Sequence, residues 1–249
     1  MRSRFALYSC GLLALPLLLS APTGAAPATE TVHEQFAQKD VTIAELRRQV
    51  AALTAQVTML KAQASASETS VPDSNGMTSL MLAIQSRNVE KTELLLAQGA
   101  DVSAADKGGN TALMLAAQWG QIDVVRALLD KGAAVDVKNQ HAPGDNGGGA
   151  TALMWAARYN HVPAVNLLVD RGASMTLGDN GGRGGALFWS GSYGQAAATK
   201  ALLDRGAPLN ARDKDGKTAL YWARRPYPGV PDGARDATVE VLKSAGGTE

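Results

Sequence analysis

A seven-residue phrase recurs at nearly constant spacing along this chain of 249 residues. It is clearest at residues 111–117, Thr-Ala-Leu-Met-Leu-Ala-Ala, and close copies begin at Thr78, Thr151 and Thr218, with a degenerate copy from Gly185. The steps between copies are therefore 33, 40, 34 and 33 residues. A fixed period of this length predicts modular units that bury their apolar faces against their neighbours rather than around one central core.

A second phrase keeps the same period. It consists of two apolar residues, two further residues and then Gly-Ala. It occurs in four of the units, beginning at Leu95, Leu128, Leu168 and Leu202. Together the two phrases resemble the ankyrin repeat, whose signature combines T-x-L-x-x-A with a period of about 33 residues. The resemblance implies an all-α solenoid of about five helix-turn-helix repeats with short β-hairpin tips, in a domain that we place at residues 73–249.

Local signals agree with two helices in each repeat. In the second repeat the Thr111 hydroxyl can cap the first helix, Gly120 can end it, and Gly132 can end the second helix. The fourth repeat has Gly185 at the capping position, so its first helix should lack a side-chain cap. In the last repeat we expect a long link over residues 225–233 and a second helix over residues 238–244.

One departure from the family pattern concerns hydrogen bonding. The family's T-P-L-H motif is replaced by Thr-Ala-Leu-Met in the second and third repeats, and Phe188 and Tyr221 stand at the His position of the last two. In the family this His helps to hold a hydrogen bond to the capping Thr. We therefore expect packing to substitute for that bond in this chain.

Residues 1–28 have the composition of a secretory signal peptide. Two arginines precede an apolar, Leu-rich run, and Ala26-Pro27-Ala28 matches a small-residue cleavage site. The run is shorter than the ~20 residues of a membrane-spanning helix, and Pro16 interrupts it. We predict export, to the periplasm in a Gram-negative cell and otherwise to the medium, with no membrane insertion after processing. An uncleaved anchor is the alternative.

Residues 30–62 carry the pattern of a coiled-coil helix. Apolar residues alternate three and four apart between residues 32 and 60, and Lys39 is the exception in this seam. β-Branched residues at the first core position of the heptad, with Leu at the second, favour a parallel coiled coil of two helices. We expect self-association through residues 32–60, as a dimer or trimer. The alternative is one amphipathic helix packed on the repeats. Residues 63–72 are predicted to be a linker.

The chain offers no convincing chemical site. A glycine-rich stretch over residues 144–151 lacks the Lys-Ser/Thr of a phosphate loop, and Asp213-Lys214-Asp215-Gly216 lacks the later Glu of a calcium loop. The three histidines are too scattered along the sequence to form a metal cluster. We predict no catalytic residues, no cofactor and no metal, and hence no enzyme. A formal net charge of +1 gives no reason to expect nucleic-acid binding.

Binding is predicted on the side of the stack formed by the first helices. Family members bind proteins through their hairpin tips and the concave face of these helices. Just after the Ala-Ala pair, three consecutive repeats have an aromatic residue, which is uncommon in a chain with 5% aromatic residues. The candidate protein-binding residues are Gln118, Trp119, Arg158, Tyr159, Ser192 and Tyr193. The alternative is that these aromatic side chains fill space between repeats. Trp155, Trp189 and Trp222 we assign to the core.

These observations favour a non-enzymatic scaffold in an exported compartment, which captures another protein through its repeat array. One alternative is a secreted effector or immunity-type protein. Another is a binder of a small ligand or metal through the Asp-Asn-Gly-Gly tips at residues 145–148 and 179–182. The sequence does not name the partner, because repeat surfaces vary over a constant core.

Overall fold

The computed structural model describes residues 43–57, 72–140 and 148–249. The chain divides near residue 56 into two compact units, a helix-bearing N-terminal unit and the repeat array. The predicted signal peptide lies outside the described residues, as do the ends of the predicted coiled coil and nearly all of the predicted linker.

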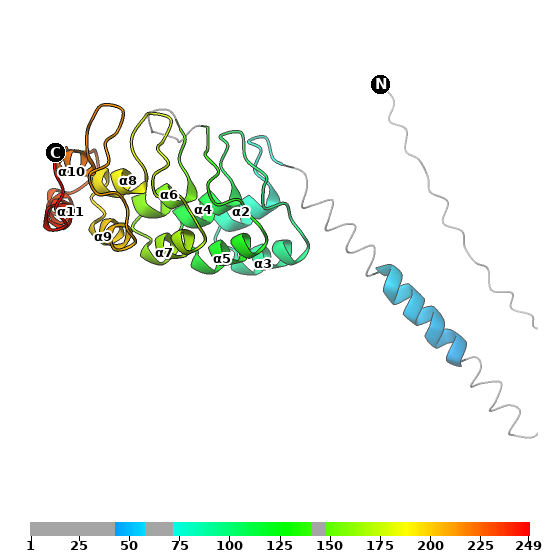
Figure 1. The fold of residues 1–249 in the computed structure, drawn as a ribbon. Coiled ribbons are helices and arrows are strands. Elements are labelled where there is room, and N and C mark those ends of the chain that lie inside the picture. Colours follow the sequence, from blue (N-terminus) through cyan, green and yellow to red (C-terminus); the bar gives the residue numbers. More distant parts are fainter. Residues whose placement is uncertain (1–42, 58–71, 141–147) are drawn as a thin grey trace, which may run out of the picture. The chain divides into compact units, whose positions relative to one another are not determined.

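The array is built from five pairs of helices. The first helices are α2 Ser79–Gln85, α4 Ala112–Gln118, α6 Ala152–Arg158, α8 Ala186–Ser192 and α10 Ala219–Arg224, and the second helices are α3 Val89–Ala97, α5 Ile122–Asp130, α7 Val162–Asp170, α9 Ala196–Asp204 and α11 Asp232–Ser244. Each first helix packs on the first helix of the next repeat, and the second helices form a parallel row (Figure 1). The predicted solenoid is confirmed.

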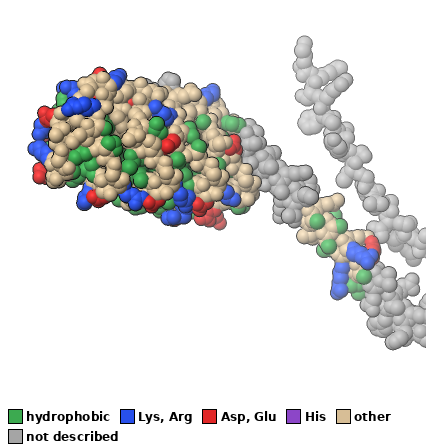
Figure 2. Space-filling view, viewed as in Figure 1, with side chains coloured by type: hydrophobic (Ala, Val, Ile, Leu, Met, Phe, Trp, Pro, Cys, Tyr) green, Lys and Arg blue, Asp and Glu red, His purple; other side chains and the backbone are tan. Residues whose placement is uncertain are grey.

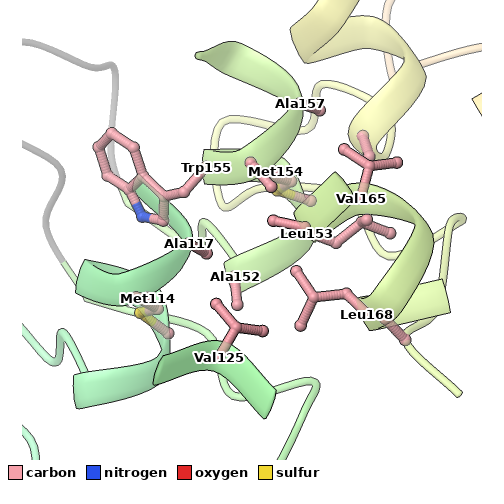
Figure 3. Close-up of a cluster of buried hydrophobic side chains, with 14 of the residues drawn as sticks. Met114, Ala117, Val125, Ala152, Leu153, Met154, Trp155, Ala157, Val165 and Leu168 are labelled. Carbon is pink, nitrogen blue, oxygen red and sulfur yellow. The ribbon is translucent and has the colours of Figure 1, made fainter. Parts of the chain in front are cut away.

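The core runs the length of the stack between these two rows. At the centre, one cluster of buried side chains contains Leu153 and Met154 of α6, Val125 of the preceding repeat and Leu168 of α7 (Figure 3). All four side chains are at most 1% exposed. The small Ala156 and Ala157 let neighbouring helices approach closely, because they add little bulk between them. Each repeat therefore depends on its neighbours for burial.

The predicted caps are present. In the first, second, third and fifth repeats a threonine hydroxyl accepts a hydrogen bond from the backbone N–H three residues later; these are Thr78, Thr111, Thr151 and Thr218. In the fourth repeat Gly185 makes no side-chain cap, as expected. The structure adds a reason for the glycine, since a Cβ atom there would collide with the Met175 carbonyl oxygen.

Restoring the consensus residue at this position should therefore destabilise the protein. A Gly185→Thr variant gains a capping hydroxyl, which is worth about 1 kcal/mol at an open site, but its Cβ has no room. We expect a lower melting temperature by circular dichroism. The comparison variant Thr151→Ala loses a cap without a clash and should cost about 1 kcal/mol. A melting temperature raised by Gly185→Thr would contradict this account.

The tips are hydrogen-bonded turns rather than strands. Within the described residues there is no strand, and one isolated antiparallel bridge joins Ala105 to Thr111. Successive tips are joined by backbone hydrogen bonds of 2.8–3.1 Å, namely Lys107 N–H to Asn75 C=O, Gln140 N–H to Gly108 C=O, Asn180 N–H to Gly148 C=O and Lys214 N–H to Gly182 C=O. The tips therefore form a continuous edge of the array.

The last two repeats contain a hydrogen bond between helix and tip that the residue pattern did not predict. The Trp222 indole N–H donates to the Asp213 carboxylate at 2.6 Å, and the Trp189 indole N–H donates to Asp179 at 3.2 Å. Each bond ties a first helix to the tip of its own repeat. In these repeats a charge-assisted hydrogen bond therefore stabilises the first helix in addition to packing, and such a bond is stronger than a neutral one.

Removing this bond alone should be measurable. Trp222→Phe keeps an aromatic ring but leaves Asp213 without its indole donor. We expect a loss of about 1.5–3 kcal/mol in the free energy of unfolding, measured by urea denaturation. Leu115→Phe, at the equivalent position of the second repeat, breaks no such bond and serves as the control. Equal losses in both variants would show that the bond contributes nothing.

The last helix begins earlier than predicted. We expected it over residues 238–244, but α11 starts at Asp232. Pro231 at its N-terminal boundary has a backbone suited to a helix start, and Asp232 forms an ion pair with Arg235 in the first turn. Lys243 is exposed in the last turn of α11, as expected of a terminal cap.

The N-terminal unit contains one described helix, over residues 43–57. The apolar residues at the predicted seam positions are all exposed, namely Ile43 (45%), Leu46 (54%), Val50 (62%), Leu53 (59%) and Val57 (48%). The rest of the predicted coiled coil, residues 30–42 and 58–62, lies outside the described residues. Among the described helices, none combines the length and the apolarity needed to cross a membrane.

Candidate protein-binding surface

The six predicted binding residues lie at the C-terminal ends of three stacked helices. Gln118 and Trp119 end α4, Arg158 and Tyr159 end α6, and the Ser192–Tyr193 pair ends α8. Because α4, α6 and α8 pack in sequence, these ends come together along one side of the array. We call this side, with the adjoining tips, the first-helix face.

Two of the three aromatic residues are exposed and the third is not. Trp119 is 37% exposed and Tyr159 is 42% exposed, whereas Tyr193 is 9% exposed. Ser192, at 5%, is buried as well. The expected row of three exposed aromatic side chains is therefore corrected to two.

Tyr193 is covered by the link of the last repeat. The Tyr193 and Tyr227 hydroxyls are 2.9 Å apart, and their ring centroids are separated by 4.6 Å. Tyr227 lies in the segment Arg-Pro-Tyr-Pro-Gly-Val-Pro of residues 225–231, which folds onto the end of α8. Helix periodicity does not determine the path of a long link, so the residue pattern did not predict this contact.

Arg158 lies among aromatic rings. Its guanidinium carbon is 4.1 Å from the Tyr193 ring centroid and 5.3, 5.5 and 5.8 Å from those of Trp155, Tyr159 and Trp189. A cation over a ring face is attracted by the ring quadrupole. Arg158 is thus held in place by stacking rather than extended into water.

Hollows lie on both sides of Arg158 and Tyr159. One, of about 330 Å³, is bounded by Trp119 and Trp155 and by residues of the first two tips. The other, of about 420 Å³, lies against Tyr193 and the link of the last repeat. Arg158 and Tyr159 line both. The first-helix face therefore presents a ridge between two depressions, a shape that can receive side chains of another molecule.

Side chains of the next repeat bind backbone carbonyls near the ends of α2 and α4. The His161 ring Nε2 lies 2.9 Å from the Gln118 carbonyl oxygen, and the Gln121 side-chain amide donates to the Ile84 carbonyl at 2.7 Å. The Ile84 carbonyl also accepts from the Arg87 backbone N–H, so the Gln121 amide adds a second bond to it. The two side-chain bonds hold the ends of α2 and α4 in register with the stack.

The remaining tryptophans belong mainly to the core, as predicted. Trp155 is 5% exposed and Trp189 is 2% exposed, and their ring centroids are 5.8 Å apart in an edge-on arrangement. Trp222 is partly buried. Trp155 and Trp189 lie beneath Arg158, and Tyr159 stacks on Trp155 at a centroid distance of 6.0 Å.

The described part of the array gives little support to a ligand at the tips. In the tip at residues 179–182 the Asp179 carboxylate already accepts from the Arg183 backbone N–H, the Arg183 side chain and the Trp189 indole. Residues 145–147 of the other Asp-Asn-Gly-Gly tip lie outside the described residues. In the segments that the structure describes, no three His, Cys, Asp or Glu side chains gather as metal ligands.

Two family matches cover about half of the chain. Residues 49–140 match the family described as ankyrin repeats in three copies, and residues 148–180 match the single ankyrin repeat. The chain belongs to the ankyrin repeat family. Ankyrin repeats are protein–protein interaction modules and are generally non-enzymatic. No curated protein matches this ankyrin chain. The pairs α8–α9 and α10–α11 continue the ankyrin stack beyond the matched residues.

Proposed function

We propose that this ankyrin protein is an exported, non-enzymatic scaffold that captures another protein on its first-helix face. The observation that carries the proposal is the pair of exposed aromatic side chains, Trp119 and Tyr159, beside Arg158 and next to a hollow. Tryptophan, tyrosine and arginine are the residues that most often dominate binding at protein interfaces. Export is supported by the composition of residues 1–28.

Site-specific crosslinking in the native cell tests this proposal. A photoreactive phenylalanine analogue is placed at Trp119 in one strain and at Lys131, an exposed residue after α5, in another. We expect a discrete crosslinked protein from position 119 in the periplasmic fraction and none from position 131. A species found outside the cell would favour the effector alternative. Equal crosslinking at both positions, or none at either, would count against capture by this face.

We propose further that the scaffold self-associates through its N-terminal helix. The seam residues of helix 43–57 alternate three and four apart, and each is at least 45% exposed. Such a stripe leaves a continuous apolar surface in water, and pairing with a second copy would bury it. Two arrays on one coiled coil would bind a multimeric partner more tightly through avidity.

The seam can be tested directly. Leu46→Glu with Leu53→Glu places charges on the stripe, and we expect sedimentation analysis to show the oligomer converted to monomer at micromolar concentration. The control is Ala52→Glu with Ala55→Glu, which adds the same charge to outward positions of the same helix and should leave the oligomer intact. A wild-type monomer at micromolar concentration would remove this part of the proposal.

A further inference from the structure

The link of the last ankyrin repeat, residues 225–231, contains a tight turn. The Val230 backbone N–H donates to the Tyr227 carbonyl oxygen at 3.0 Å, and the two residues between them are Pro228 and Gly229. Gly229 has a φ of +82°. Proline at the second position and a glycine of positive φ at the third are characteristic of a type II turn. The turn therefore holds a tyrosine and a valine at its two ends.

This turn covers one aromatic residue of the first-helix face. Tyr227 and Val230 are half-buried, whereas the two residues between them are exposed. The Tyr227 ring lies on Tyr193, with their centroids 4.6 Å apart. A Cβ atom added at Gly194 would come within 2.8 Å of Val230 Cγ1, so the valine packs against the backbone just after Tyr193. Both end residues of the turn therefore contact the end of α8.

The preceding repeats present the same helix ends in an uncovered form. Tyr159 and Tyr193 follow α6 and α8 at equivalent positions, yet Tyr159 is 42% exposed and Tyr193 is 9% exposed. In the described segments, residues 119–121 alone join α4 to α5 and residues 159–161 alone join α6 to α7. Such short links cannot fold back over a helix end. A turn supplied by another protein could cover Tyr159 and Trp119 as the link covers Tyr193.

The hollow beside Trp119 is continuous with the surface that the link occupies. Arg158 and Tyr159 line this hollow on one side and the depression beside the link on the other. The contact between the link and the array therefore ends where the hollow begins. A second turn bound in the hollow would extend an interface that the chain already forms within itself.

The lining of the hollow suits an uncharged turn. Leu115, Trp119 and Trp155 provide apolar and aromatic surface, and Gln85 and Gln118 provide side-chain amides. An amide both donates and accepts hydrogen bonds, so it can bind the backbone N–H and C=O groups that a turn leaves without an internal partner. Aromatic side chains gain most by burial against such a surface.

Charge does not direct this surface toward an ionic ligand. The Asp106 carboxylate, which lines the hollow, accepts from backbone N–H groups of its own tip. Arg183 pairs with Asp179, and Arg224 pairs with Glu249. In the view of Figure 2, side chains of both charges occur along the edges of the array, with hydrophobic side chains between them. We therefore expect burial of apolar surface to supply most of the affinity.

We propose that the first-helix face recognises an aromatic-Pro-Gly turn of its protein partner, the structure that residues 227–230 supply within the chain at Tyr193. This inference rests on the proposed capture of a protein by the same face. The aromatic side chain of the turn enters the hollow beside Trp119. Proline fixes φ before binding, so the turn loses less conformational entropy when it binds.

A peptide with the sequence of the link, Arg-Pro-Tyr-Pro-Gly-Val-Pro, is the probe. It carries a fluorescent label and is titrated with the full-length protein, and binding is followed by fluorescence anisotropy. We expect saturable binding that weakens by about tenfold or more when alanine replaces the tyrosine of the peptide, or when Ala-Ala replaces its Pro-Gly. The protein variant Trp119→Ala should weaken binding to a similar extent. The control Leu94→Ala also truncates an exposed apolar side chain, but on a second helix, and should bind like wild type.

Failure of the inference can be distinguished from failure of the proposed function. If the peptide does not bind up to about 1 mM, while position 119 still crosslinks a protein in the cell, the inference is overturned and capture by the face stands. Binding that is unchanged in Trp119→Ala, or equal for the alanine peptides, also overturns the inference. Absence of both peptide binding and crosslinking would count against both proposals.

A second variant serves if circular dichroism shows Trp119→Ala to be poorly folded. Gln85 is exposed and lines the same hollow, so its replacement should leave the fold intact. Gln85→Ala should weaken peptide binding by about threefold, because it removes one hydrogen-bonding amide. Unchanged binding by Gln85→Ala in that case would overturn the inference.

Discussion

Replacing Leu153 with alanine is expected to lower the free energy of unfolding by about 2–5 kcal/mol. The side chain is fully buried at the centre of the ankyrin stack, in the cluster that also contains Val125 of the preceding repeat and Leu168 of α7 (Figure 3). Truncation removes its apolar contacts and leaves a cavity that the closely packed alanines of α6 cannot fill. Urea denaturation followed by circular dichroism measures the loss.

The control for this prediction is Leu82→Ala, in the first helix of the first repeat. Leu82 is 42% exposed, so its truncation creates no closed cavity and should cost less than about 1 kcal/mol. Similar losses in the two variants would mean that the stack does not depend on its central interfaces. The denaturant slope should stay unchanged in both variants, because neither alters how much surface unfolding exposes.

The sequence predicted the features of this fold that neighbouring residues determine. Each capping threonine forms its bond three residues along the chain, as at Thr111 and Thr151, so the motif alone indicates it. The packing of the helices follows from the period, because each repeat buries its apolar residues against the adjacent repeat. The absence of a side-chain cap in the fourth repeat was likewise predicted from a single residue, Gly185.

What the sequence did not reveal depends on contacts between distant residues. Tyr193 occupies the same position in its repeat as the exposed Tyr159, and its burial follows from Tyr227, which lies 34 residues later. The bond from the Trp222 indole to Asp213 joins a helix to a tip, and a residue pattern does not give the direction of a side chain. The early start of α11 has a local cause instead, because apolar periodicity is weak in its first turns.

The second large effect is expected on binding rather than folding. Trp119→Ala and Tyr159→Ala should each weaken capture of the crosslinked partner by about 2 kcal/mol, or about thirtyfold in Kd. Each removes a large ring that stands beside the hollow next to Arg158. Isothermal titration calorimetry with the purified partner measures the change.

The control variant for this prediction is Tyr193→Ala. Trp119 and Tyr159 are more than a third exposed, so their loss should shift the melting temperature little, although Tyr159 also stacks on Trp155. Tyr193 is buried against Tyr227 and supports Arg158, so its truncation should lower stability by about 2 kcal/mol or more. Tyr159→Ala should therefore weaken binding with little loss of stability, whereas Tyr193→Ala, at the equivalent position of the next repeat, should lower stability. If Tyr159→Ala unfolds the protein as readily as Tyr193→Ala does, the aromatic residues of this face are structural, and the binding surface must lie elsewhere on the array.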